Sequence, residues 1–276
     1  MDINTIRHIE RPPSAADVTH WREGLAWLSG GTWLFSEPQP ALDTLIDLRA
    51  FDWPALAVSA DGLDIAATAR IADLDKLVFP KEWTAGPLLS LCCRALLMSF
   101  KIAHEASVGG NICMSLPAGA MISLSTALEG TYTLWPRDAE PRTVAAIDFV
   151  TGNRANVLAP GELLRSIHLP ASALTKRFAF RRSSLTHLGR SAALLIGTSG
   201  PDGDLLLTIT ASTFHPVQLR FGPSPSAVDV RRAIDAAIPQ DGYFDDVNGL
   251  PAYRRHLTYH FAEEIRAELA GSGAVA

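Results

Sequence analysis

The chain has 276 residues, of which 47% are apolar, and a formal net charge of −5 at pH 7. This size and composition predict a globular protein of about one to three compact units with a large buried core. The acidic balance and the lack of a basic stripe argue against nucleic-acid binding. Three cysteines are too few for a disulfide framework or for a four-cysteine iron–sulfur cluster.

The first five residues lack the basic and apolar regions of a signal peptide. The longest apolar candidate for a membrane span is interrupted by Arg94 and Lys101. We therefore expect a cytoplasmic protein without a membrane span.

The first fifty residues predict a short mixed unit. Residues 1–13 are expected to form an exposed lead-in, and Ser14 is a candidate N-cap for a helix through Trp27. Residues 25–28 read as a strand, and residues 42–48 alternate in the way of a second strand. Helix, strand, glycine loop and strand together predict a small βαβ-like unit.

The middle of the chain favours strands with helices at one side. Residues 55–67 predict a hairpin that turns at Asp61-Gly62. Thr68 is a candidate cap for a helix over residues 71–77, and a longer helix is expected over residues 87–105. Further strands are expected at residues 121–128, 131–135, 142–147 and 167–169.

A break near residues 170–175 separates a C-terminal region with its own strands and helices. Strands are expected at residues 178–182, 191–196 and 205–209, followed by helices at residues 227–238 and 251–270. The whole pattern predicts the α+β class rather than a doubly wound sheet.

Two stretches of the chain share one chemistry. They are Ser29-Gly30-Gly31-Thr32-Trp33-Leu34 and Ser107-Val108-Gly109-Gly110-Asn111. A glycine pair beside a hydroxyl can form a loop with positive φ whose bare backbone N–H groups approach a ligand. One such pair is more often an ordinary turn, but the two together suggest a shared anionic ligand such as a pyrophosphate.

Other motifs are absent or weak. The chain has no G-x-G-x-x-G, P-loop or G-x-S-x-G pattern, which argues against a Rossmann domain, a P-loop nucleotidase and a hydrolase elbow. His256 and His260 lie four residues apart on an expected helix, but the charges beside them favour an exposed polar face over a metal site. The pair Arg181-Arg182 can hold a phosphate, yet such a pair is more often solvated or ion-paired.

A series of motifs runs through most of the chain in a characteristic order. They are Ser29-Gly30-Gly31-Thr32-x-Leu34, Leu45-Ile46-Asp47-Leu48, Asp61-Gly62-Leu63-x-Ile65-x-Ala67-Thr68, Ala72-Asp73-Leu74, Ser107-Val108-Gly109-Gly110-Asn111, Pro117-Ala118-Gly119, Asp148-Phe149 and Pro160-Gly161-Glu162-Leu163-Leu164-x-x-Ile167-x-Leu169-Pro170. This series resembles the FAD-binding subunit of the molybdenum hydroxylases, the xanthine dehydrogenase and carbon monoxide dehydrogenase medium-chain family.

The resemblance implies a fold and a set of cofactor contacts. The fold would be a PCMH-type FAD-binding domain over residues 1–172, with subdomains of about 1–54 and 55–172, followed by a C-terminal domain at 173–276. Both glycine stretches would hold the pyrophosphate, and Leu163 or Leu164 would lie near the flavin ring. The implied contact residues are Ser29, Gly30, Gly31, Thr32, Trp33, Leu34, Thr68, Ser107, Val108, Gly109, Gly110, Asn111, Gly119, Ala120, Leu163, Leu164 and Arg182.

The resemblance also implies a function. A molybdenum-cofactor large subunit would oxidise the substrate, and 2Fe-2S clusters on a small subunit would pass electrons to non-covalently bound FAD on this chain. NAD or another acceptor would then receive them, so the chain would be an oxidoreductase subunit with no catalytic acid, base or metal ligand of its own.

Several positions depart from the family's usual pattern, namely Trp33, Ala103-His104 and Ala120. Ala120 stands where an Asp is common, and a carboxylate there would accept hydrogen bonds from the cofactor. Two alternatives therefore stay open: an interaction subunit of the same fold that has lost FAD, and a stand-alone flavin oxidase.

Overall fold

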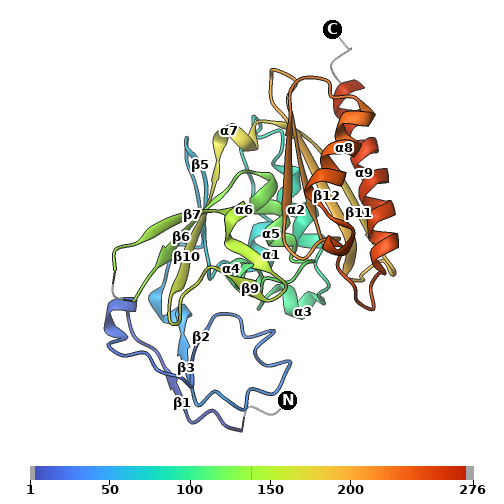
Figure 1. The fold of residues 1–276 in the computed structure, drawn as a ribbon. Coiled ribbons are helices and arrows are strands. Elements are labelled where there is room, and N and C mark those ends of the chain that lie inside the picture. The colour runs from blue at the N-terminus through green and yellow to red at the C-terminus, as the bar shows by residue number, and fades with distance from the viewer. Residues whose placement is uncertain (1–3, 138, 272–276) are drawn as a thin grey trace.

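The computed structural model of the protein describes residues 4–137 and 139–271. Its N-terminal part is a three-stranded parallel sheet in the order β1-β3-β2, at one end of the molecule (Figure 1). The strands are β1 (His8–Glu10), β2 (Leu25–Leu28) and β3 (Thr44–Asp47). The strands predicted at residues 25–28 and 42–48 are confirmed, whereas β1 falls in the predicted lead-in, of which residues 1–3 lie outside the described residues.

The helix predicted to begin at Ser14 does not form. A short 3₁₀ turn, η1 (Ala15–Asp17), follows Ser14, and the chain then runs irregularly to β2. Trp21 packs on Trp27 with ring centroids 4.9 Å apart, and Gly24 has a φ of +94°, which an α-helix does not allow. Helix propensity is a weak preference that such tertiary contacts override.

The middle of the chain forms a five-stranded antiparallel sheet in the order β4-β5-β10-β6-β7. Its strands are β4 (Leu56–Val58), β5 (Gly62–Ala66), β6 (Thr131–Trp135), β7 (Arg142–Ala145) and β10 (Leu163–Pro170). The hairpin predicted at Asp61-Gly62 is confirmed by the pairing of β4 with β5. Short elements complete the region: η2 (Leu48–Phe51), α6 (Ala146–Phe149), β8 (Val150–Gly152), β9 (Ala155–Asn156) and α7 (Ala171–Leu174).

Five helices lie between β5 and β6 in the chain. They are α1 (Ile71–Asp75), α2 (Pro87–Arg94), α3 (Phe100–Ala103), α4 (Val108–Cys113) and α5 (Ala120–Ala127). The helix predicted over residues 87–105 is therefore broken, because Ser99 caps a new helix by accepting a hydrogen bond from the N–H of Ile102. Residues 95–98, which lie in this break, line a cavity described below.

Thr68 does not cap α1, contrary to the prediction. The N-cap of α1 is Arg70, whose side chain makes no capping bond. The first free N–H of the helix, at Ile71, donates instead to the carbonyl of Ala106 at 2.9 Å. A distant backbone segment thus provides the cap that a local side chain was expected to provide.

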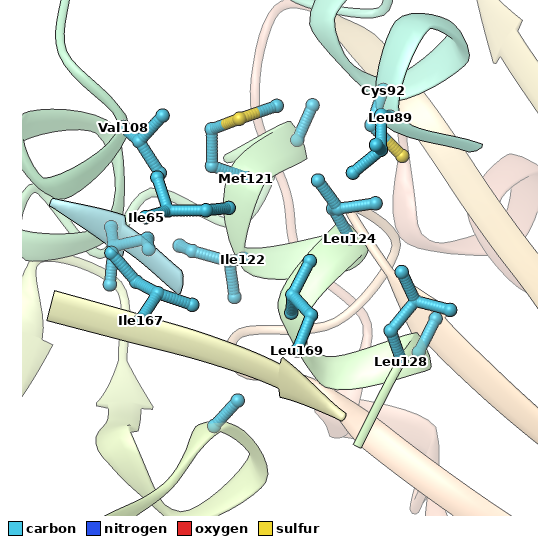
Figure 2. Close-up of a cluster of buried hydrophobic side chains, with 14 of the residues drawn as sticks. Ile65, Leu89, Cys92, Val108, Met121, Ile122, Leu124, Leu128, Ile167 and Leu169 are labelled. Carbon is cyan, nitrogen blue, oxygen red and sulfur yellow. The ribbon is translucent and has the colours of Figure 1, made fainter. Parts of the chain in front are cut away.

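Residues 121–128 were predicted as a strand, but residues 121–127 belong to helix α5, which begins at Ala120, and Leu128 is its C-cap. All of its residues are buried. Figure 2 shows Met121 and Leu124 of α5 among side chains of β10, such as Ile167, and of α2, such as Cys92. A helix that is apolar on every side has neither a clear helical nor a clear strand period, so its sequence pattern does not identify it.

The C-terminal part is a four-stranded antiparallel sheet, β11-β12-β13-β14, with two helices. The three predicted strands and both predicted helices are confirmed, whereas β14 was not predicted although its residues alternate. The elements are β11 (Arg177–Ser184), β12 (Ser191–Ser199), β13 (Leu205–Thr210), β14 (Val217–Phe221), α8 (Ala227–Ala237), η3 (Gln240–Gly242) and α9 (Pro251–Gly271).

This sheet is covered on both faces (Figure 1). Leu194 and Ile196 of β12 join the core around α5, and Leu195 joins a second core with α9. The hydroxyls of Ser123 and Thr210 lie 2.7 Å apart and join α5 to β13. The α+β class is confirmed. The domain boundary near residue 172 stays a prediction, and the central core contains residues from both sides of it.

Residues 138 and 272–276, which fall within the two predicted domains, lie outside the described residues. Within the described ranges, none of the helices combines the length and the apolar content that crossing a bilayer requires.

Candidate functional site

A cavity of about 510 Å³ lies where the N-terminal sheet meets the middle helices. This volume falls within the range of roughly 300–1,000 Å³ that is typical of small-molecule and cofactor sites. The wall is mostly apolar and comes from segments far apart in the sequence. They are the first glycine stretch after β2, the break between α2 and α3, the second glycine stretch, the start of β10, and Arg190 just before β12.

The first glycine stretch is a loop, as predicted. Gly31 has a φ of +68°, and the turn closes where the N–H of Phe35 donates to the Gly31 carbonyl at 2.8 Å. Among the described residues, no protein acceptor receives the backbone N–H groups of residues 30–34. Consecutive unpaired N–H groups in such a turn form a concave anion-binding site. A Cβ on Gly30 would lie 1.7 Å from the Glu105 carbonyl oxygen, so this loop passes directly against the backbone just before the second glycine stretch.

The second glycine stretch differs from the prediction, because it is helical and has no residue with positive φ. Its N–H groups are already paired: Val108 donates to the Ala69 carbonyl at 2.9 Å, and Gly109 donates to the Ala67 carbonyl at 2.9 Å. A Cβ on Gly109 would lie 2.4 Å from the Cβ of Ala67. This glycine therefore allows α4 to pack against the end of β5.

Two polar side chains of the same stretch also serve the protein itself. The Ser107 hydroxyl caps α4 by accepting from the N–H of Gly110 at 3.1 Å. The Asn111 side-chain oxygen accepts from the N–H of Met121 at 3.0 Å, next to the start of α5. The second stretch thus shapes the cavity wall, and most of its hydrogen-bonding capacity is used internally.

Glu162 is the one acidic residue of the cavity wall within the described chain, and it is buried. Its carboxylate accepts two hydrogen bonds from Arg142, at 2.7 and 2.8 Å, and one from the N–H of Ala159 at 2.9 Å. The bonds from Arg142 lower the pKa of Glu162 below its ordinary value, and burial opposes this shift. Its charge is therefore balanced, and the residue fixes the turn that leads into β10.

Arg190 is the cation of the cavity wall, and across the described residues it has no hydrogen-bond or ion-pair partner. It ends the loop between β11 and β12, which Arg182 holds in place. Arg182 donates from Nε to the Ser191 hydroxyl at 2.8 Å and from Nη2 to the Gly189 carbonyl. An unpaired guanidinium on an apolar wall is a strong anchor for an anion.

Cys113 also lines the cavity, and burial raises the pKa of its thiol to about 12. The thiol is therefore protonated at neutral pH, which disfavours a role as a nucleophile.

The structure brings most of the predicted site residues to this cavity. Those on its wall are Ser29, Gly30, Gly31, Thr32, Trp33, Leu34, Ser107, Gly109, Gly110, Asn111, Gly119, Leu163 and Leu164. Those that it places elsewhere are Thr68, Val108, Ala120 and Arg182. Val108 and Ala120 point into the central core, and Arg182 supports the loop that carries Arg190.

Sequence reasoning missed several residues of the wall. Trp27 precedes the first glycine stretch, residues 96–98 form the break before Ser99, and Arg190 comes from a distant loop. The break could have been inferred from an apolar run that meets a serine N-cap. No local signal marks Arg190, because only the fold brings it to the cavity.

The family model described as "FAD binding domain in molybdopterin dehydrogenase" matches residues 9–172. A xanthine dehydrogenase of Oryza sativa is 32% identical over 121 residues, which are 42% of this chain and 9% of that protein. The chain thus spans about a tenth of the length of that relative. The carbon monoxide dehydrogenase medium chain of Afipia carboxidovorans is 26% identical over 201 residues, which are 69% of this chain and 68% of the relative.

The fold is also similar to a solved structure over its full length. A chain of quinoline 2-oxidoreductase from Pseudomonas putida 86 superposes with a TM-score of 0.79 at 17% identity, covering 100% of both chains. At this identity the similarity shows the fold.

Proposed function

Because the chain belongs to the family of FAD-binding domains of molybdopterin dehydrogenases, we propose that it binds FAD without a covalent bond and transfers electrons as one subunit of a molybdenum hydroxylase. The observation that carries this proposal is the convergence of both glycine stretches on one cavity, with unpaired N–H groups in the first. FAD, when bound, supplies the ability to take up electrons singly and to release them singly or as a pair.

The residues present fit this cofactor. The N–H groups of residues 30–34 suit the pyrophosphate, since such groups bind phosphate oxygens without a side-chain charge. Arg190 adds a positive charge for the same anion or for the flavin. Leu163 and Leu164 offer an aliphatic surface for the isoalloxazine, and this wall also excludes water from it.

The cavity holds few groups that can exchange protons with a substrate. The Glu162 carboxylate is ion-paired with Arg142, and the Cys113 thiol stays protonated. The protein's contribution is thus to bind and orient the cofactor and to set the electrostatic field around it.

We further propose that the electrons come from partner subunits. A 2Fe-2S cluster held by cysteines alone needs four of them, and this chain has three, of which Cys92 and Cys93 lie in the core. The clusters would belong to a small subunit and the molybdenum cofactor to a large subunit, with NAD or another molecule as the final acceptor. The free cysteines are consistent with a reducing compartment such as the cytoplasm.

Acid precipitation of the purified protein tests the cofactor. We expect a yellow supernatant that contains FAD. A protein that is colourless and gains no visible absorbance after incubation with FAD would contradict the proposal and favour the alternative of an interaction subunit without flavin.

Co-expression with candidate large and small subunits tests the assembly. We expect one complex on a sizing column, with interfaces of at least about 1,600 Å² in total, and bleaching of the flavin absorbance by the complex's substrate. A chain that alone oxidises a small substrate through its flavin would favour the alternative of a stand-alone oxidase.

A further inference from the structure

Trp33 lies in the first glycine stretch and forms part of the cavity wall. Two hydrogen bonds to its carbonyl oxygen fix the backbone there, one from the N–H of Ser36 at 2.8 Å and one from the Ser36 hydroxyl at 2.7 Å. The indole is half-buried and follows the unpaired N–H groups of Gly31 and Thr32 directly in the chain. The backbone that carries this large planar side chain is thus fixed beside the anion-binding turn.

Arg154 supports the indole from outside the loop. Its guanidinium carbon lies 5.7 Å from the centre of the Trp33 ring, close enough for a cation–π contact. The backbone of Arg154 has a φ of +60° and donates to the Ser115 carbonyl at 2.9 Å, and its Nη2 lies 3.8 Å from a Glu37 oxygen. These contacts connect the Trp33 ring to the segment that leaves α4.

Trp27 is the other tryptophan of the cavity wall, and its ring makes contacts within the protein. Its ring packs on Trp21 at 4.9 Å and on Phe51 at 6.4 Å between centroids, and its N–H donates to the Gly161 carbonyl at 3.3 Å. Trp33 makes no ring–ring contact within the described residues. Of the two indoles, Trp33 is therefore the one with ring surface available to a ligand.

We propose that the Trp33 indole is the stacking surface for the adenine ring of FAD, an inference that rests on the proposed function. If residues 30–34 hold the pyrophosphate, the adenine is joined to it through a compact ribose, whereas the isoalloxazine is joined through an extended ribityl chain. A side chain within the phosphate-binding turn is thus within reach of the nearer ring. Leu163 and Leu164 offer an aliphatic wall, which suits the flavin ring but provides no stacking partner for adenine.

Comparing FAD with FMN tests this assignment, because FMN lacks the adenine. Flavin fluorescence titrations of the apoprotein would give both dissociation constants for the wild type, Trp33→Leu and Trp33→Phe. We expect Trp33→Leu to weaken FAD binding about tenfold, since base–aromatic stacking has about this strength, and to change FMN binding less than about twofold. Trp33→Phe should retain most of the FAD affinity because it keeps an aromatic face.

ADP provides a second readout that does not depend on the flavin. It should compete with FAD on the wild type and compete about tenfold less well on Trp33→Leu. Arg154→Met, which keeps the length of the side chain but removes the cation, should weaken FAD binding less than Trp33→Leu does.

The outcomes separate the two proposals. Equal losses of FAD and FMN affinity in Trp33→Leu would place the indole at the flavin half and overturn this inference alone, as would no loss of either. A wild-type protein that binds neither flavin would overturn the proposed function and this inference with it.

Discussion

The two glycine stretches have nearly the same sequence chemistry and different structures. In the first, residues 29–34 form a turn with a positive φ at Gly31 and unpaired N–H groups. In the second, residues 108–113 form a helix whose first N–H groups donate to residues 67 and 69 and to Ser107. A glycine pair thus indicates that another group comes close to the backbone. Whether that group is a ligand or another segment of the protein decides the role of the pair.

The contacts of the glycines make the same point. Gly30 lies against the Glu105 carbonyl, and Gly109 lies against Ala67, so both are needed for packing between segments of the protein. Gly110 is different, because a Cβ there would meet the Ser107 hydroxyl alone, at 2.8 Å. The anion-binding role that we propose for the first loop therefore rests on its free N–H groups rather than on missing side chains.

Alanine substitution of one glycine in each stretch should give the largest difference in stability between the two stretches. Gly30→Ala places a methyl group 1.7 Å from a backbone oxygen that cannot easily move, and should cost about 3 kcal/mol of unfolding free energy. Gly110→Ala should change it by less than about 1 kcal/mol, because alanine favours the helix and the one close contact is a small side chain. Urea denaturation measures both, and equal losses would show that the two glycines are equivalent.

Glu162 fixes the turn before β10, which is part of the cavity wall, through its ion pair with Arg142. Glu162→Gln should cost about 2 kcal/mol of unfolding free energy at pH 7, since charged hydrogen bonds to a buried group are lost. Because folding lowers the pKa of Glu162, its contribution is complete above its ordinary pKa of about 4.5 and is lost as the pH falls through the lower folded value.

The difference between wild type and Glu162→Gln should therefore shrink below about pH 4.5 in urea titrations. Glu140→Gln, at an exposed position, is the control and should change the stability by less than about 0.5 kcal/mol. A difference that stays constant down to pH 3 would contradict the role of the charge.

Arg190 is a second candidate anchor for an anion in the cavity. The N–H groups at the start of the second glycine stretch are already paired within the protein, so an anion there would depend on this side chain. Arg190→Met should weaken FAD binding about tenfold, as expected when one charge-assisted hydrogen bond is lost. Arg94→Met removes an exposed cation on α2 and serves as the control. Equal FAD affinities of wild type and Arg190→Met in a fluorescence titration would exclude Arg190 as an anchor.

The smallest expected effect concerns the serines that begin the two stretches. Ser107→Ala removes the N-cap of α4 and should cost about 1 kcal/mol of unfolding free energy. Ser29→Ala should cost less than about 0.5 kcal/mol, because the Ser29 hydroxyl has no protein partner among the described residues. Thermal or urea unfolding of both variants measures this difference, and the reverse order would contradict the capping role.

Much of the fold could be predicted where a pattern is local. The strands β2, β6 and β13 and the helix α9 follow from short apolar runs, alternation or helical spacing within their own residues. The failures are elements that distant contacts decide. α5 is surrounded by core on all sides and so lacks a period, and the segment after Ser14 is fixed by its packing on Trp27.

The sequence predicted which residues line the candidate site better than it predicted the local structure of those residues. The two glycine stretches were expected to share a ligand, and they line one cavity. The helical state of the second stretch depends on acceptors at Ala67 and Ala69, some forty residues earlier, and no local pattern reveals them. Arg190 likewise reaches the wall only through the loop that Arg182 supports.

Hydrogen exchange of the backbone amides, with and without FAD, tests the central claim most directly. In the apoprotein, residues 30–34 should exchange quickly and residues 108–110 slowly, since only the latter donate to protein acceptors. On adding FAD, residues 30–34 should become protected while residues 108–110 change little. Protection that appears at residues 108–110 and not at residues 30–34 would contradict the assignment of the first loop as the phosphate-binding element.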